Sequence, residues 1–266
     1  MQRYLFTMVW NKVSHSPTKT DRIITRMTSK ATLENAKRAA AFAAGENHVF
    51  SGCRLGVGSG STVKYLVEFL ADRTKKGVLK NIVCVPTSFL TRKWLLDAGL
   101  QLTTLEQTPE LDVCIDGADE VDAELNCIKG GGGCLTQEKI VQTCAKHFFV
   151  IADIGKDSKV LGEKFHHLPI EVVPSAYVPV MRWIQNREGG ECVLRMAVKK
   201  CGPVITDNNN YIIDWNFPKD KSHDWAALHQ RLVNLPGVVE SGLFVGVAEK
   251  VYFATPDGSI TTRDRS

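Results

Sequence analysis

Two short segments of this sequence combine the residue types needed to move a proton on a small phosphorylated substrate. Residues 116–120 read D-G-A-D-E and place carboxylates directly after the apolar run 111–115. Residues 129–133 read K-G-G-G-G and lead into L-T-Q-E at 135–138. Carboxylates exchange protons, an ammonium stabilises an oxyanion, and glycine amides in front of a helix bind phosphate. The pattern predicts acid–base chemistry beside an anion site.

Glu138 has two interpretations. An acid in the first turn of a helix gains about 0.3–1 kcal/mol from the helix dipole, which would make Glu138 structural. Its combination with Asp116 and Lys129 favours a catalytic base instead. Four acids within residues 116–122 repel one another and raise some of their pKa values, so the cluster needs a cation. Lys129 is the nearest candidate for this cation. A solvated acidic loop is one alternative interpretation of the cluster. A metal site is another, but the spacing of the four acids is not that of a calcium-binding EF-hand loop.

A second glycine-rich segment, G-V-G-S-G-S-T at 56–62, follows a predicted strand and opens a predicted helix. Its hydroxyls and free N–H groups suit an anion, although a plain capped turn explains it equally well. The segment is not a P-loop, because no lysine follows the last glycine. It is also a poor dinucleotide fingerprint, since the glycine spacing breaks at Ser61 and the next strand ends without an acid. A further strand end, 151–153, is followed by Lys156, which is either a ligand-binding cation or a surface lysine.

Histidine and cysteine patterns predict neither a metal site nor a cofactor. His48, His147, His166 and His167 show no metal spacing and no arrangement with a nucleophile and an acid, so we interpret them as structural or surface residues. The eight cysteines form no C-x-x-C pair, which is typical of reduced thiols in a cytosolic compartment. Cys134, beside the glycine run, is the one thiol in a position that suggests reactivity, and simple packing is the alternative.

The elements that must position these residues alternate along the chain from about residue 28. Short apolar strands are predicted at 54–57, 82–85, 100–105, 111–115 and 148–152. Helices are predicted at 31–44, 63–75, 89–98 and 135–146, the last with Thr136 as its cap. This alternation predicts an α/β fold with a parallel sheet covered on both faces.

Beyond residue 165 the pattern changes to β-α-β-β-α-β. The strands are predicted at 169–173, 192–198, 211–215 and 238–244, and the helices at 177–187 and 225–235. This order fits a split-βαβ module. The last strands, 243–247 and 251–254, are expected to return to the first domain, in an order that the sequence does not fix.

The charge of the chain is concentrated at its start. The 266 residues carry a net charge of +4, but residues 1–30 hold six Lys or Arg and one acid, so the remainder has a net charge of −1. The body is therefore not expected to bind nucleic acid, and no apolar run reaches the roughly 18 residues of a membrane helix. The basic, acid-poor tail is either a mitochondrial transit peptide or a disordered extension.

Taken together, these motifs resemble ribose-5-phosphate isomerase, type A. The resemblance is carried by G-V-G-S-G-S-T, D-G-A-D-E, K-G-G-G-G-x-L-T-x-E-K and I-A-D-x-x-K, then P-G-V-V-x-x-G-L-F and T-P-D-G, and it runs from about residue 31 to 258. It implies an aldose–ketose isomerase that interconverts ribose 5-phosphate and ribulose 5-phosphate in the pentose phosphate pathway. It further implies a homodimer or homotetramer. The thiol pattern predicts a cytoplasmic location, with organellar targeting by the tail as an alternative.

The resemblance also implies domains and roles. Residues 28–165 and 243–266 would form a Rossmann-like catalytic domain, 166–242 a ferredoxin-like α+β domain, and 1–27 the tail. Glu138 would move the proton between C1 and C2, Asp116 and Asp119 would handle hydroxyl and ring-oxygen protons, and Lys129 would stabilise the enediolate. The residues implied to bind substrate are Ser59, Gly60, Ser61, Thr62, Asp116, Gly117, Ala118, Asp119, Lys129, Gly130, Gly131, Gly132 and Lys156.

Two other classes of protein remain as alternatives. A non-catalytic sugar-phosphate sensor would carry a DNA-binding module, and the tail of about 30 residues is too short to resemble one. A nicotinamide-dependent oxidoreductase would need the glycine spacing and the acidic residue that the 56–62 segment and the following strand lack.

Overall fold

Three sheets make up the computed structural model, which describes the backbone of residues 19–265 and the side chains of residues 31–265. The largest is a six-stranded sheet of order β13-β12-β6-β3-β1-β2, in which all neighbours are parallel except the β12–β13 pair. Its strands are β1 (Arg54–Val57), β2 (Val83–Pro86), β3 (Leu111–Asp116), β6 (Ala145–Asp153), β12 (Lys250–Ala254) and β13 (Ile260–Asp264). The predicted α/β fold with a parallel central sheet is confirmed.

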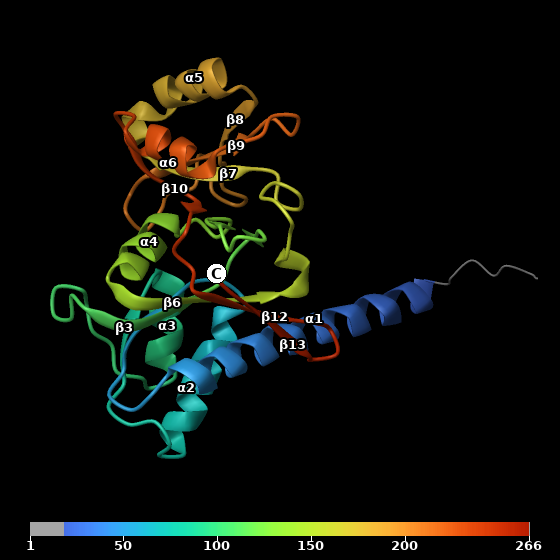
Figure 1. The fold of residues 1–266 in the computed structure, drawn as a ribbon, viewed down its shortest axis with the longest axis vertical. Coiled ribbons are helices and arrows are strands. Elements are labelled where there is room, and N and C mark those ends of the chain that lie inside the picture. The colour runs from blue at the N-terminus through green and yellow to red at the C-terminus, as the bar shows by residue number, and fades with distance from the viewer. Residues whose placement is uncertain (1–18, 266) are drawn as a thin grey trace, which may run out of the picture.

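Helices cover both faces of this sheet. They are α1 (Lys19–His48), α2 (Val63–Lys75), α3 (Phe89–Asp97) and α4 (Leu135–Thr143). Because side chains alternate along a strand, Val113 and Ile115 of β3 pack in one core with α1 and α2, while Cys114 packs in a second core with Val141 of α4. Figure 1 shows α1 running along the sheet, with its N-terminal part extending beyond the rest of the fold.

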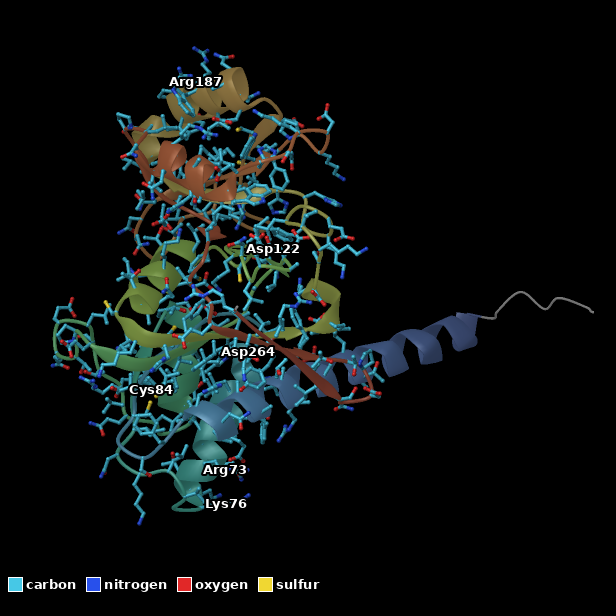
Figure 2. The ribbon with its side chains drawn as sticks, in the orientation of Figure 1. Arg73, Lys76, Cys84, Asp122, Arg187 and Asp264 are labelled. Atoms are coloured by element: carbon cyan, nitrogen blue, oxygen red, sulfur yellow. The ribbon has the colours of Figure 1, made fainter. Side chains whose placement is uncertain are left out.

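A four-stranded antiparallel sheet forms the second layer. Its elements are β7 (Leu168–Val172), α5 (Tyr177–Glu188), β8 (Glu191–Leu194), β9 (Tyr211–Asn216), α6 (Trp225–Val233) and β10 (Val238–Ser241). The order β10-β7-β9-β8 with βαββαβ connectivity is a ferredoxin-like arrangement, built around the fully buried Trp215. In Figure 2, Arg187 of α5 marks this end of the molecule, and Arg73 and Lys76 mark the opposite end.

A small three-stranded sheet joins the two layers. It consists of β4 (Glu120–Val121), β5 (Cys127–Ile128) and β11 (Leu243–Phe244), in the order β11-β5-β4. Gly242 connects the four-stranded sheet to the small sheet. Its N–H donates to the carbonyl of Pro169 in β7 at 2.7 Å, and its carbonyl accepts the N–H of Lys129, the residue after β5, at 2.9 Å. A Cβ on Gly242 would lie 2.2 Å from the Lys129 carbonyl oxygen. The predicted strand 238–244 is therefore divided into β10 and β11 at this glycine.

Other predicted elements differ from the structure in informative ways. The predicted strand 100–105 is wrong: this segment makes one isolated bridge, between Cys84 and Leu102, before it turns away at Thr104. The helix predicted at 135–146 ends at Thr143, because β6 begins at Ala145. Of the predicted tail, residues 1–18 lie outside the described residues, and 19–27 belong to α1. Within the described residues, no helix is both long enough and apolar enough to cross a bilayer.

Candidate active site

The candidate site lies at the carboxyl ends of three neighbouring strands of the six-stranded sheet. Asp116 is the last residue of β3, the loop at Gly58 follows β1, and Asp153 ends β6. In open α/β sheets, this edge is where ligands bind. The small sheet brings Lys129, the residue after β5, to the same place, and α4 adds Glu138 from its first turn.

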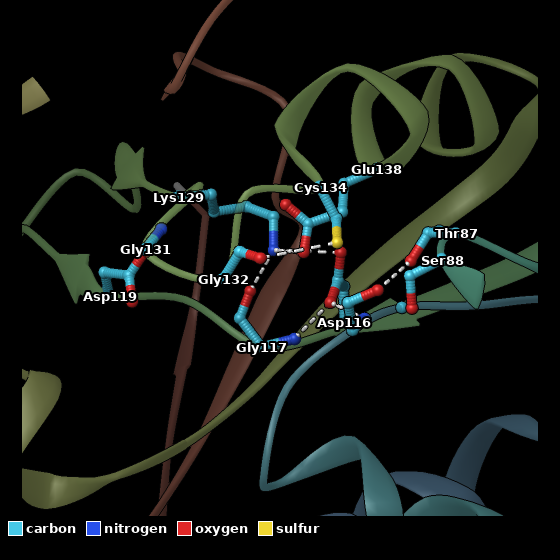
Figure 3. Close-up of polar contacts among 12 residues, drawn as sticks. Thr87, Ser88, Asp116, Gly117, Asp119, Lys129, Gly131, Gly132, Cys134 and Glu138 are labelled. Carbon is cyan, nitrogen blue, oxygen red and sulfur yellow. Dashed lines mark hydrogen bonds and ion pairs between the residues drawn. The ribbon is translucent and has the colours of Figure 1, made fainter. Parts of the chain in front are cut away.

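Lys129 is paired with two carboxylates at the bottom of the site. Its Nζ lies 2.9 Å from Asp116 Oδ2 and 3.3 Å from Glu138 Oε1, and it also donates a hydrogen bond to the Gly117 carbonyl. Figure 3 shows the ammonium between these groups. The exposed fractions are 2% for Lys129, 0% for Asp116 and 5% for Glu138. The predicted cluster of Asp116, Lys129 and Glu138 is thus brought together, almost fully excluded from solvent.

Burial and charge set the protonation of this cluster. Burial raises the pKa of Glu138 to about 8, and the negative charge of Asp116 acts in the same direction, against the opposing effect of Lys129. Burial also raises the pKa of Asp116, with Lys129 again opposing it. For Lys129, burial disfavours the charge, but the two carboxylates outweigh it and raise its pKa. The site therefore holds a permanent cation next to a carboxyl group that exchanges protons near neutral pH.

Asp116 does not line the pocket itself, but it holds the backbone of two residues that do. Its Oδ1 accepts the backbone N–H groups of Ser59 at 2.8 Å and Gly117 at 2.7 Å. A Cβ on Gly58 would lie 1.9 Å from the same oxygen, so only glycine allows β1 to approach this closely. Asp119, in contrast, lines the pocket, and its Oδ2 accepts the Gly131 N–H at 2.7 Å.

The other two acids of the 116–122 cluster have structural roles. Glu120 is fully buried and accepts hydrogen bonds from Ser158 Oγ at 2.7 Å and from two backbone N–H groups, at 2.6 and 2.7 Å. Asp122, labelled in Figure 2, accepts the backbone N–H groups of Glu124 at 2.9 Å and Asn126 at 2.8 Å. Glu120 and Asp122 thus receive their hydrogen bonds from backbone amides and, for Glu120, from a hydroxyl group. The cation Lys129 compensates Asp116 and Glu138 instead.

The first glycine loop leads into α2 and is held from two sides. Ser59 Oγ lies 2.7 Å from Thr87 Oγ1, and Thr91 Oγ1 donates to the Gly58 carbonyl at 2.7 Å. Thr62 makes no side-chain cap on α2. The start of this helix therefore faces the pocket with N–H groups that can bind an anion.

These elements enclose a cavity of about 320 Å³. Its lining residues are Leu33, Lys37, Ser59, Gly60, Ser61, Thr62, Gly117, Ala118, Asp119, Lys129, Gly130, Gly132, Glu138, Ala152, Asp153 and Lys156. Of the residues implied to bind substrate, Asp116 and Gly131 lie outside this lining. Sequence reasoning missed Leu33 and Lys37, because the packing of α1 against α2, β6 and β12 brings them to the site.

The start of α4 differs from the predicted cap, and it also bears on the predicted reactivity of Cys134. Thr136 does not cap the helix: the cap position is Cys134, which makes no side-chain cap hydrogen bond, and Thr136 Oγ1 is buried without a partner. Burial raises the pKa of the half-buried Cys134 thiol to about 12, which favours its protonated form. In the described part of the chain, no group of three or more His, Cys, Asp or Glu is arranged to hold a metal ion.

Comparison with known proteins shows the family of the chain. The chain matches the family described as ribose 5-phosphate isomerase A (phosphoriboisomerase A) over residues 83–258. It is 62% identical over 231 residues to a Caenorhabditis elegans protein named probable ribose 5-phosphate isomerase, a match that covers 86% of this chain and 92% of that protein. It is 54% identical over 233 residues to the Homo sapiens ribose-5-phosphate isomerase, covering 87% and 74% of the two chains.

Solved structures give the same result. A D-ribose-5-phosphate isomerase in complex with phospho-erythronic acid superposes with a TM-score of 0.83 and 36% identity, covering 88% of this chain and 99% of that one. The ribose 5-phosphate isomerase of Plasmodium falciparum superposes with a TM-score of 0.82 and 33% identity, covering 88% and 99%.

Fold and site therefore define an α/β enzyme of the isomerase class. The chain belongs to the ribose 5-phosphate isomerase A family. The predicted family and the predicted activity, interconversion of ribose 5-phosphate and ribulose 5-phosphate, are confirmed.

Proposed function

We propose that this interconversion proceeds through an enediolate, with Glu138 as the group that moves the proton. The carboxylate of Glu138 removes the proton from C2 of the open-chain aldose, and the electron pair moves onto the C1 carbonyl oxygen. Glu138 then returns the proton to C1, while the proton of the C2 hydroxyl is transferred to the C1 oxyanion, so that C2 becomes the carbonyl and C1 the hydroxymethyl group. A positioned base of this kind contributes about 10²–10⁴-fold to the rate.

One observation carries the proposal: the Lys129 ammonium lies 3.3 Å from Glu138 Oε1, and both side chains are almost completely shielded from solvent. When the proton leaves carbon, negative charge develops on the neighbouring oxygen, and Lys129 is the cation available to stabilise it. Such a preorganised donor is worth roughly 3–4 kcal/mol in the transition state. The raised pKa of Glu138 suits a group that must both take and return a proton near neutral pH.

We assign the remaining polar groups by their position. Asp119 lines the pocket, whereas Asp116 is occupied with Lys129 and two backbone amides, so Asp119 is the better candidate for opening the sugar ring. The N-terminus of α2, Lys37 and Lys156 also line the cavity, and we assign the phosphate to them. Binding the phosphate away from the reacting carbons provides orientation for the proton transfer.

A reaction analogue tests the enediolate. A four-carbon phosphorylated acid, 4-phospho-erythronate, carries a fixed negative charge where the enediolate would carry it, and erythritol 4-phosphate is the matched neutral control. We expect the acid to bind at least 100-fold more tightly than ribose 5-phosphate, as transition-state analogues do. The acid should lose this advantage in a Lys129→Met variant. Equal inhibition by the acid and the alcohol would contradict an anionic intermediate.

We further propose that the enzyme is a cytoplasmic homodimer or homotetramer acting in the non-oxidative pentose phosphate pathway. All eight cysteines are free thiols, which fits a reducing compartment. Cell fractionation tests the location, and light scattering coupled to size exclusion tests the oligomeric state.

A further inference from the structure

Arg195 connects the four-stranded sheet to the glycine loop of the candidate site. It follows β8 directly, and its guanidinium Nη1 donates to the carbonyls of Gly130 at 2.9 Å and Gly131 at 3.2 Å. Its other edge forms a two-point contact with Asp214 of β9, with Nε donating to Oδ2 at 2.8 Å and Nη2 to Oδ1. The side chain is 15% exposed, so this contact is largely shielded from solvent.

The backbone of Arg195 is fixed as well. Its N–H donates to the Ile212 carbonyl at 2.8 Å, and its carbonyl accepts the Val204 N–H at 2.9 Å. Asp214 also lies 3.7 Å from His167 Nε2. Arg195 is therefore fixed by its backbone and by Asp214, and it contacts a run of four glycines, a residue type that permits many backbone conformations.

Holding these two carbonyls decides where the adjacent N–H groups point. In a trans peptide, the C=O of one residue and the N–H of the next point in opposite directions. The Gly130 carbonyl faces Arg195, so the Gly131 N–H faces away, and it reaches Asp119 Oδ2 at 2.7 Å. The Gly131 carbonyl also faces Arg195, which turns the Gly132 N–H toward the same side, and Gly132 lines the pocket.

We propose that Arg195 is a positioning residue for the isomerisation. It orients the two successive peptide units so that one N–H holds Asp119 and the next faces the substrate, forming a small concavity of N–H donors. Glycine-rich backbone would otherwise sample many conformations, and each lost orientation would misplace Asp119. This inference rests on the proposed role of Asp119 and the glycine loop in the reaction.

Only arginine fits this task. The planar guanidinium presents donors on two edges at once, so it binds the Asp214 carboxylate and the loop carbonyls together. A lysine at position 195 would keep the charge, but its single ammonium lacks this fixed two-edged geometry. We therefore expect Arg195→Lys to recover only part of the function that Arg195→Gln loses.

Arg231 provides a matched control in the same module. It makes a two-point contact with Glu188, through Nε to Oε1 at 2.9 Å and Nη2 to Oε2 at 3.2 Å, and neither residue lines the site cavity. Both Arg195→Gln and Arg231→Gln remove one such ion pair. Steady-state kinetics then measure kcat and KM, and NMR of ¹⁵N-glycine-labelled protein follows the Gly131 and Gly132 amides.

We expect Arg195→Gln to lower kcat about ten-fold or more, because small displacements of reacting groups are costly. Its Gly131 amide should lose the downfield shift and exchange protection given by Asp119. Arg231→Gln should leave the Gly131 amide signal unchanged and kcat within two-fold of the wild-type value. Should Arg195→Gln not fold, Asp214→Asn and Arg195→Lys are measured instead, with the same direction expected.

An unchanged Gly131 amide, or a kcat loss in Arg195→Gln no larger than in Arg231→Gln, would overturn the inference. The proposed mechanism has its own separate test. If Glu138→Gln kept normal turnover, the mechanism would fail, whatever the Arg195 variants showed.

Discussion

The Lys129 ammonium and the Asp116 carboxylate lie 2.9 Å apart, and both are almost completely excluded from water. With Glu138 added, two carboxyl groups share one cation in a closed space. Full ionisation of both acids would leave an uncompensated buried charge, which is costly. The site therefore favours the state in which one proton is retained, and Glu138, with its pKa raised to about 8, is the group positioned to exchange it with substrate.

Replacing Lys129 by Met should destabilise the fold as well as stop catalysis. Removing one partner of a buried ion pair leaves the other charge unpaired, which costs about 3–5 kcal/mol. The loss should be largest near neutral pH and should shrink on acidification, as the remaining carboxyl groups become protonated. Urea titration of both proteins at pH 5 and pH 7.5 measures this. A difference under 1 kcal/mol at pH 7.5 would argue that the pair is not buried as described.

The pH dependence of the reaction should follow Glu138. A base works only when deprotonated, and burial raises its pKa from the ordinary 4.5 to about 8. We expect kcat/KM to fall about ten-fold per pH unit below that value, since kcat/KM reports ionisations of the free enzyme. A profile that stayed flat down to pH 5 would show that the essential base has an ordinary carboxyl pKa.

Glycine is required at position 58 for a steric reason. In Gly58→Ala, the new Cβ would lie 1.9 Å from Asp116 Oδ1, so β1 or the carboxylate must move. Gly132→Ala is the control, because its Cβ would meet nothing within 4 Å. We expect thermal melting to show a clear loss of Tm for Gly58→Ala alone. Equal Tm values for the two variants would contradict the close approach of β1 to Asp116.

Lys37 and Lys156 should contribute to substrate binding rather than to proton transfer. Both line the cavity, whereas Lys129 is the cation paired with Asp116 and Glu138, so Lys37→Ala and Lys156→Ala should raise KM more than they lower kcat. Lys93→Ala is the control, because that lysine pairs with Asp97 on the exposed surface of α3. A loss confined to kcat would place these lysines in the chemical step instead.

How much of this site follows from the sequence depends on the range of the contacts involved. Asp116, Asp119, Lys129 and Glu138 could be predicted, because strand ends and helix starts are local patterns that place such residues at one sheet edge. Lys37 could not, since nothing in the local sequence of α1 shows that the helix crosses this edge.

Sequence alone also could not separate the roles of neighbouring acids. Glu120 and Asp122 are carboxylates in the same short segment as Asp116 and Asp119, yet both bind backbone N–H groups at 2.6–2.9 Å, those of Gly162 and Lys164 for Glu120 and those of Glu124 and Asn126 for Asp122. The predicted strand 100–105 failed for a similar reason. Its apolar and β-branched residues suit a strand, but the chain passes β2 only at Leu102 before turning away.

The most direct test of this account is turnover of ribose 5-phosphate by the purified protein and by Glu138→Gln, each in the presence of a chelator. We predict that the wild-type protein produces ribulose 5-phosphate under these conditions. The Glu138→Gln variant should lose about 10²-fold or more in kcat while still binding substrate. Near-normal turnover by the variant would contradict the assignment of Glu138 as the base.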